Sequence, residues 1–334
     1  MKTLKQVLAV AALSALSTLA FAQKDGIVDP GRQPYYDAFK DKTISIAVAT
    51  MGLDLSQAWV STIRRDLEPL GVKINVRDYS WKPDVGAQAL TSMIAEEPDI
   101  MVVHNVDVTS FARLIKRAES AGIPVVQLNT KAIYTSSAYV GVDWTEIGER
   151  AAETLVKACG EGTSRKVAIM QGAVTDPAST YQLRGVNNVL EKHPEITVVS
   201  DQAADWDSSK AYAITTTILR QHPDLCGITG FWDGMDVGIG NAVLDAKPAQ
   251  PVTVVSSGGG ATSACDNVKK GVFTHYVSFN APLQGHDLSS ALKTILQQKL
   301  DVGTGQFYLY SKLDVIDKDN LTPQSCWDLN DYQQ

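Results

Sequence analysis

Strand-like and helix-like patterns alternate along most of this chain, and the alternation occurs twice. The first run begins with the apolar stretch Thr43–Thr50 and ends with Pro124–Leu128. The second begins with Lys166–Gln171 and ends with Phe307–Val315. Strands separated by helices at this spacing form parallel sheets with right-handed crossovers. The chain therefore predicts an α/β fold of two similar doubly wound lobes, one after the other.

Residues 122–148 connect the two runs. They contain two short apolar strands, Pro124–Leu128 and Ala138–Val142, and each is followed by a polar loop. Thr145 is placed to cap the helix that comes next. We expect one lobe to finish here and the chain to cross to the other.

Residues 1–22 have the pattern of a secretory signal peptide. Lys2 and Lys5 precede an apolar run, Val7–Leu19, and Ala20-Phe21-Ala22 forms an A-x-A cleavage site. The apolar run is shorter than the roughly 20 residues that span a bilayer, so an uncleaved membrane anchor is the less favoured alternative. We expect a soluble mature protein that is exported to the periplasm.

The size and charge of the chain limit the class of protein further. A mature chain of this length exceeds the size at which one core usually stops growing, which favours two domains. The net charge of -7 argues against a nucleic-acid partner, which would need a basic surface.

The four cysteines have no zinc-site spacing and form no C-x-x-C motif. Export permits disulfides. Cys159 closes the helix after the crossing and Cys226 opens the strand Gly227–Gly230, so both would lie at one end of the second sheet if the helix and the strand are adjacent. Of three possible connectivities we therefore favour Cys159–Cys226 with Cys265–Cys326. Four free, buried thiols are the alternative.

Polar side chains and tryptophans gather in the loops that follow the predicted strands. Ligands of open parallel sheets lie beyond the carboxyl ends of the strands, so two facing sheets would place these loops around one cleft. A tryptophan face packs against the C–H face of a sugar or polyol, while amides and carboxylates bind its hydroxyls. A place in the core is the alternative for each tryptophan; we interpret Trp327 as structural and leave Trp81 and Trp144 open. The predicted ligand-binding residues are Asp54, Ser56, Trp59, Asn105, Asn129, Thr130, Gln182, Trp206, Trp232, Asp233, Gly258 and Asn280.

With these residues in place, the chain resembles the type I periplasmic solute-binding proteins, in particular the ribose- and galactose-binding branch of ABC sugar importers. The resemblance covers about residues 43–315. It rests on the motifs GIPVVQLN, AYVGVDWTEIG, STYQLRGVNNVL, AADWDSSKA, GFWDGMDVGIGNAV and FNAPLQG. It implies two lobes that close on a sugar by bending at three crossings, near Ser136–Asp143, Asn280 and Tyr308–Leu313. We accordingly expect residues 42–138 with 281–308 to form the N-terminal lobe, and residues 139–280 with 309–334 to form the C-terminal lobe.

The resemblance also assigns roles to single positions. It places Trp59 and Trp206 where the family has stacking aromatic residues. It places Asn280 at a polar position beside the second crossing, and Asp233 at an aspartate typical of the family.

Other positions depart from the family pattern. Asn129 and Thr130 stand where an Asp-Arg pair is common, Gln182 stands where an Arg is common, and Gly258 replaces an Asp. Trp232 replaces the usual Asn. These changes remove charged groups that fork around a pyranose or furanose. They favour a neutral ligand, such as a polyol or a modified sugar, over ribose, galactose or glucose.

Enzyme signatures are missing from the sequence, which has no P-loop, no H-E-x-x-H and no G-x-S-x-G. Gly258–Gly260 does not form a G-x-G-x-x-G motif. The histidines lack metal-ligand spacing, and His104 is placed at a strand end within reach of the cleft. Acidic residues in the strand-end loops leave a glycosidase as a minor alternative.

The sequence therefore predicts a non-enzymatic substrate-binding protein of an ABC importer. It would bind a small neutral sugar or polyol between two lobes and deliver it to an inner-membrane permease. We expect a monomer that uses no cofactor and no metal. The alternatives are a protein of the same fold that presents a signalling molecule to a receptor and, less favoured, a periplasmic glycosidase.

Overall fold

The computed structural model of the protein describes residues 29–300, 302–303 and 305–332. The predicted signal peptide lies outside the described residues. The chain divides after Ala38 into two units, and the first holds helix α2 (Arg32–Asp37). Every other helix and strand of the described residues belongs to the second unit, which starts at Phe39. Among the described residues, no helix is both long enough and apolar enough to cross a membrane.

Six parallel strands form the first sheet, in the order β11-β5-β4-β3-β1-β2. The first run of the chain supplies four of these strands and the helices between them. The strands are β1 (Thr43–Val48), β2 (Lys73–Asp78), β3 (Ile100–Val103), β4 (Val125–Asn129), β5 (Ala138–Gly141) and β11 (Phe307–Tyr310). The helices are α3 (Asp54–Leu67), the short η1 (Glu68–Leu70), α4 (Pro83–Ala95) and α5 (Ala112–Ser120).

The second sheet also has six strands, in the order β12-β10-β9-β8-β6-β7. Neighbouring strands in this sheet are parallel, except for the antiparallel pair β10 and β12. Its strands are β6 (Lys166–Gln171), β7 (Thr197–Ala203), β8 (Gly227–Gly230), β9 (Thr253–Gly258), β10 (His275–Phe279) and β12 (Leu313–Asp317). The remaining helices from residue 144 onward are α6 (Trp144–Ala158), α7 (Pro177–Leu190), α8 (Ser208–Gln221), α9 (Asp233–Ala246), α10 (Thr262–Lys269), α11 (Ala281–Gln298) and η2 (Leu329–Asp331).

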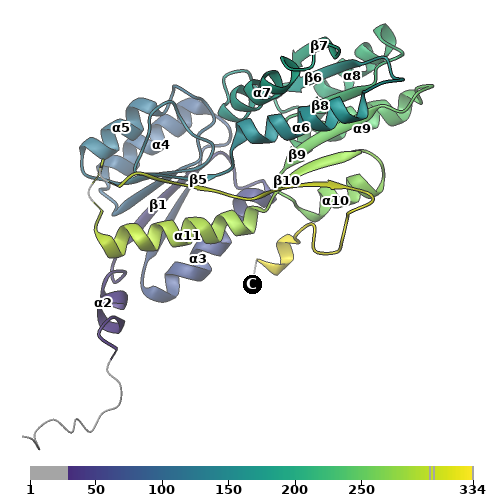
Figure 1. The fold of residues 1–334 in the computed structure, drawn as a ribbon. Coiled ribbons are helices and arrows are strands. Elements are labelled where there is room, and N and C mark those ends of the chain that lie inside the picture. Colours follow the sequence, from purple (N-terminus) through teal and green to yellow (C-terminus); the bar gives the residue numbers. More distant parts are fainter. Residues whose placement is uncertain (1–28, 301, 304, 333–334) are drawn as a thin grey trace, which may run out of the picture. The chain divides into compact units, whose positions relative to one another are not determined.

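Each sheet carries helices, and we call a sheet together with the helices packed on it a lobe (Figure 1). In the sequence, the strands are short apolar runs because helices cover the faces of a parallel sheet. All four residues of β3, for example, are buried. The predicted fold of two similar, parallel-dominated α/β lobes is confirmed.

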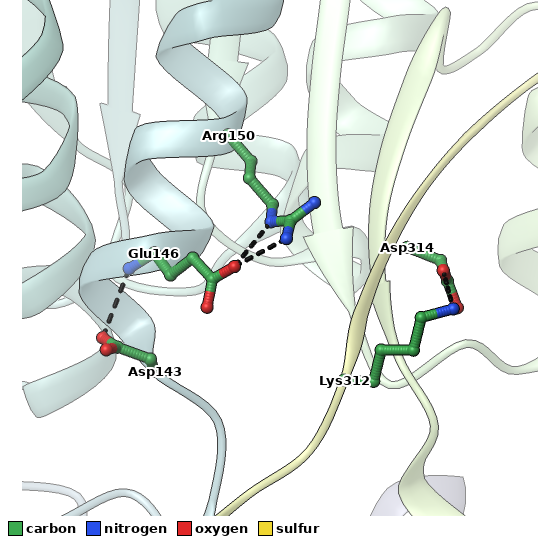
Figure 2. Close-up of polar contacts among 5 residues, drawn as sticks. All are labelled: Asp143, Glu146, Arg150, Lys312 and Asp314. Carbon is green, nitrogen blue, oxygen red and sulfur yellow. Dashed lines mark hydrogen bonds and ion pairs between the residues drawn. The ribbon is translucent and has the colours of Figure 1, made fainter.

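The chain passes between the two sheets three times. It leaves the first sheet after β5, returns after β10 through α11, which packs on α3, and crosses again between β11 and β12. Figure 1 shows this last segment, in yellow, running from β5 to β10. An exposed ion pair at 2.7 Å joins Lys312, between the two strands, to Asp314 of β12 (Figure 2). Pairing of β5 places residues 138–141 in the first sheet, whereas the expected lobe boundary lay after residue 138.

Asp143 caps helix α6, at the first of these passages. Its carboxylate accepts hydrogen bonds from the backbone N–H groups of Thr145 and Glu146, at 3.0 and 3.2 Å. Figure 2 shows the bond from Glu146. The predicted cap at Thr145 is therefore wrong, because Thr145 already lies within the first helical turn. An aspartate accepts these bonds as well as threonine does and adds a negative charge at the positive end of the helix. Glu146 also forms an ion pair with Arg150, one helical turn further along α6 (Figure 2).

Two disulfides, Cys159–Cys226 and Cys265–Cys326, hold the second lobe. The first joins the end of α6 to the residue before β8, and the second joins α10 to the C-terminal segment. The favoured pairing is confirmed, and the alternative of four free thiols is wrong. The prediction assumed that the helix ending at Cys159 and the strand after Cys226 are adjacent, and α6 does contact β8.

We expect the Cys159–Cys226 bridge to contribute substantially to stability. Its partners are 67 residues apart in sequence, so the bridge restricts the unfolded chain. The double variant C159S/C226S should lose about 2–4 kcal/mol of unfolding free energy, measured by urea denaturation. In the exported protein, titration under denaturing conditions should find no free thiol; four titratable thiols would contradict both bridges.

Candidate functional site

One cavity of about 330 Å³ lies where the strands of the two sheets end. Its wall includes residues that follow strands of the first sheet, such as Trp81 after β2 and His104 after β3. It also includes residues that follow strands of the second sheet, such as Asp176 after β6 and Trp206 after β7. This is where open parallel sheets bind ligands, because the carboxyl ends of all strands meet at one edge.

The structure brings seven of the predicted ligand-binding residues into the cavity wall. They come from both lobes: three end or follow strands of the first sheet, and four end or follow strands of the second. The seven are Asp54, Asn129, Thr130, Trp206, Trp232, Asp233 and Gly258.

Trp59 and Ser56 lie outside the cavity wall, although both belong to α3, whose first residue, Asp54, is part of the wall. Trp59 is fully buried, and its indole N–H donates to Oε1 of Gln284 on α11, at 3.0 Å. Its ring meets the ring of His104 edge to face, with centroids 5.3 Å apart. Trp59 therefore supports His104 from behind, and His104 itself faces the cavity.

The other three predicted residues outside the wall make contacts within the protein. Asn105 is buried, and its backbone carbonyl oxygen accepts a hydrogen bond from the Thr130 hydroxyl at 2.5 Å. Gln182 donates from Nε2 to the carbonyl oxygen of Phe231 at 3.0 Å. Asn280 caps α11 by accepting from the backbone N–H of Leu283 at 2.9 Å.

Sequence reasoning missed part of the aromatic wall. Trp81 and Trp144, left open from the sequence, both line the cavity, as do Phe231 and Phe279. Trp144 meets Phe279 edge to face at 5.6 Å and donates its indole N–H to the carbonyl oxygen of Asn129 at 2.6 Å. The signal was available, because Trp144 follows a strand and starts a helix.

Trp206 and Trp232 form one corner of the cavity. Their ring centroids are 6.2 Å apart and the ring planes cross at 83°. Both rings are half-buried and also pack against the core of the second lobe. Behind them, the fully buried Asp236 accepts from the backbone N–H of Trp232 at 3.2 Å and from the Ser256 hydroxyl at 2.7 Å. This pair of bonds fixes the loop that carries Trp232.

Each of the three carboxylates in the wall lies at the N-terminus of a helix. Asp54 begins α3, Asp176 caps α7 and Asp233 begins α9. The positive end of a helix dipole offsets part of such a negative charge. Among the described residues that line the cavity, none is Lys or Arg.

Asp233 is held in place by a hydrogen-bonded chain. The Tyr276 hydroxyl donates to Oδ2 of Asp233 at 2.7 Å and accepts from the backbone N–H of Gly260 at 2.9 Å. Burial raises the pKa of Asp233 to about 6, although the bond from Tyr276 acts in the opposite direction. Its carboxylate thus has a fixed direction at the cavity wall.

Two further groups in the wall titrate outside their ordinary range. Burial raises the pKa of Asp176 to about 7; the hydrogen bond from the Ala178 backbone N–H opposes this shift, and the nearby charge of Asp107 adds to it. Burial lowers the pKa of His104 to about 4, so its ring is neutral at pH 7. Within the described chain, nothing hydrogen-bonds Nδ1 of His104 or Oδ1 of Asn129, and both atoms are buried. The wall therefore offers unsatisfied polar atoms of neutral side chains.

The two lobes also touch each other directly. The backbone N–H of Val108, in the first lobe, donates to the carbonyl oxygen of Thr175, in the second, at 3.1 Å. Farther along, the ammonium group of Lys131 lies 5.5 Å from the ring of Tyr181 on α7. The same ammonium lies 5.0–5.6 Å from three tyrosine rings of the first sheet, those of Tyr139, Tyr308 and Tyr310.

The fold and the cavity together define a two-lobed α/β protein with a cavity lined by residues of both lobes. Residues 44–300 match the family model of the periplasmic binding protein domain, and the chain belongs to this family. The resemblance inferred from the sequence motifs is thereby confirmed.

Several curated relatives share part of the sequence. The ribose import binding protein of Bacillus subtilis is 23% identical over 205 residues, which cover 61% of this chain and 66% of that protein. The D-apiose import binding protein of Paraburkholderia graminis is 27% identical over 63% of this chain and 68% of its own. The xylitol-binding protein of Mycolicibacterium smegmatis is 26% identical over 75% of this chain and 71% of its own.

Solved structures share the fold. A solute-binding protein of Burkholderia graminis in complex with D-arabinose superposes with a TM-score of 0.76 at 20% identity and covers 86% of this chain and 99% of that one. A solute-binding protein of Agrobacterium vitis bound to α-D-tagatopyranose gives a TM-score of 0.75 at 21% identity, over 86% of this chain and 98% of that one.

The different surroundings of the tryptophans lead to a stability prediction. Trp59→Ala empties a fully buried site and should lower the unfolding free energy by about 3–5 kcal/mol. Trp206→Ala and Trp232→Ala remove half-buried rings beside a cavity and should cost clearly less. Urea denaturation of the three variants measures this order; equal losses would contradict the assignment of Trp206 and Trp232 to the wall.

Asp176 should make stability depend on pH. Its folded pKa, about 7, exceeds the ordinary value of 3.8, so between these values the unfolded chain releases a proton that the folded chain keeps. The stability that Asp176 contributes is therefore present below about pH 4 and lost as the pH rises to about 7. Asp176→Asn avoids this loss and keeps the oxygen that caps α7.

Denaturation at a series of pH values tests this prediction. The unfolding free energy of Asp176→Asn, relative to the unchanged protein, should rise between pH 4 and pH 7. Asp207→Asn, the matched change at the exposed cap of α8, serves as the control for replacing a capping aspartate. A constant difference for Asp176→Asn across this range would refute the buried, uncharged state.

Proposed function

We propose that this protein is the substrate-binding component of an ABC importer and captures a small sugar or polyol between its lobes. The observation that carries this proposal is the single cavity shared by the strand ends of two sheets, with an aromatic wall and inward-facing polar groups. The curated relatives whose names mention ribose, D-apiose and xylitol support the same class of ligand.

The wall has both kinds of contact that a sugar or polyol needs. The faces of Trp81, Trp144, Trp206 and Trp232 pack against C–H groups. Carboxylate, amide and imidazole groups exchange hydrogen bonds with hydroxyls, and the fixed carboxylate of Asp233 determines the direction of one of them.

The charges of the wall favour a ligand without negative charge. Carboxylates line the cavity, and no lysine or arginine of the described chain joins them there. A phosphate or carboxylate on the ligand would be buried beside Asp176 and Asp233 without a partner, which is costly. The missing basic partners at Thr130 and Gln182, noted in the sequence, support the same neutral ligand.

Binding would work through closure of the two lobes. The three passages between the sheets act as the hinge, and the lobe boundaries near residues 138, 280 and 308 are part of the proposal. The ligand touches both lobes only when they are closed and so favours that state by its differential affinity. A permease in the inner membrane then takes the ligand from the closed protein.

The remaining parts of the proposal concern location and chemistry. The protein is exported by the signal peptide at residues 1–22 and acts in the periplasm as a monomer. It holds its ligand without converting it, as a binding protein does.

A thermal-shift screen tests the ligand class. D-ribose, D-allose, D-apiose, D-arabinose and xylitol form one panel, and ribose 5-phosphate and glucuronate form the control panel. A ligand at 100 times its dissociation constant should add about 2.7 kcal/mol of stability. Trp232→Ala should weaken the binding of that ligand about tenfold or more, because the ring supplies buried contact area. A response to the anionic panel alone would rule out this ligand class.

A further inference from the structure

The C-terminal segment reaches from one lobe to the other, and we call residues Cys326–Tyr332 the strap. At its start, Cys326 is bonded to Cys265 on α10 of the second lobe. At its end, the short helix η2 contacts α3 of the first lobe. Figure 1 shows this yellow segment ending beside α3. The strap therefore links the lobes in addition to the hinge and to the contacts of Val108 and Lys131 with the second lobe.

The middle of the strap holds a loop of the cavity wall. Trp327 is 6% exposed; its backbone N–H donates to the carbonyl oxygen of Gly260 at 3.0 Å, and its indole N–H donates to that of Gly259 at 2.6 Å. The carbonyl oxygen of Trp327 accepts from the backbone N–H of Thr262 at 2.9 Å. Gly259 and Ala261 line the cavity on the other side of this loop. The strap thus fixes the loop from behind.

The loop around Gly260 is also connected by hydrogen bonds to the Asp233 carboxylate in the cavity wall. Gly260 has a φ of +79°, and a Cβ there would lie 2.7 Å from Oγ of Ser278, so the loop needs glycine at this point. The N–H of Gly260 donates to the Tyr276 hydroxyl, which in turn donates to Asp233. A continuous set of bonds therefore joins the strap to the Asp233 carboxylate.

The strap packs on the first lobe both through Trp327 and through its far end. Trp327 shares a small buried cluster with Ala58 of α3, and Leu55 and Tyr332 pack at its edge. The guanidinium carbon of Arg65, also on α3, lies 5.8 Å from the Tyr332 ring centroid. Leu55 is itself a residue of the cavity wall.

We propose that the strap holds the two lobes in the closed arrangement even when no ligand is bound. Separation of the lobes would move α3 away from the loop at Gly259, and the strap, tied to α10 by its disulfide, would lose its packing on α3. Contacts made in only one of two arrangements shift the equilibrium toward that arrangement. This inference rests on the proposed function only in taking the lobes to open and close.

The test compares two disulfide variants of the ligand-free protein. C265S/C326S unties the strap, whereas C159S/C226S removes the matched bridge, which makes no link to the first lobe. Small-angle scattering should show a larger radius of gyration for C265S/C326S and no change for C159S/C226S. Hydrogen exchange at the Thr262 amide should speed up about fivefold or more in C265S/C326S only, as expected for the loss of one hydrogen bond.

A second pair of variants leaves both disulfides intact. Tyr332→Ala removes the ring that faces Arg65, and Tyr332→Phe keeps it. Tyr332→Ala should also increase the radius of gyration, and Tyr332→Phe should not. The two Tyr332 variants test the proposal even if C265S/C326S does not fold.

The proposal would be overturned by an unchanged radius of gyration in Tyr332→Ala. It would also be overturned if the two disulfide variants changed the radius of gyration equally. These measurements use no ligand, so their failure is distinct from a failure of the sugar and polyol screen. A protein that closes without a strap could still bind a sugar, and a strapped protein could still reject the whole panel.

Discussion

All strands of a parallel sheet end at the same edge, and in this protein two such edges share one space. The helices that follow the strands therefore direct their N-termini at a common point. Asp54, Asp176 and Asp233 lie at three of these N-termini, where the helix dipole offsets part of the cost of burying a carboxylate. The cavity can thus hold acidic side chains although no lysine or arginine stands among the described residues of its wall. The same backbone geometry that builds the lobes sets the electrostatics of the site.

Much of the fold and half of the site can be predicted from the sequence, because both follow from local patterns. Alternating strand and helix signals define two parallel sheets, and a residue just after a strand is near the ligand edge. This reasoning places Trp206, Trp232 and Asp233 correctly in the wall. It also finds the disulfides, since Cys159 and Cys226 lie at the same end of adjacent elements.

The remainder depends on which face of a helix is turned inward, and sequence position does not decide that. Trp59 is five residues after Asp54, which at about 100° per residue places it about 140° away around α3. It consequently packs on α11, while Asp54 faces the cavity. Asp176 was missed for a different reason: it starts a helix before Pro177 and reads as an ordinary cap, although its carboxylate also faces the cavity.

Strand β11 has a consequence for how the protein is made. It completes the first sheet by pairing with β5, yet its residues, 307–310, leave the ribosome long after residues 138–141 of β5. Until then β5 is an open sheet edge, which is a template for pairing with other chains. The first lobe therefore cannot finish folding before most of the second lobe has been synthesised. Its assembly is a late, long-range event, and neither lobe can be cut out as one continuous piece of chain.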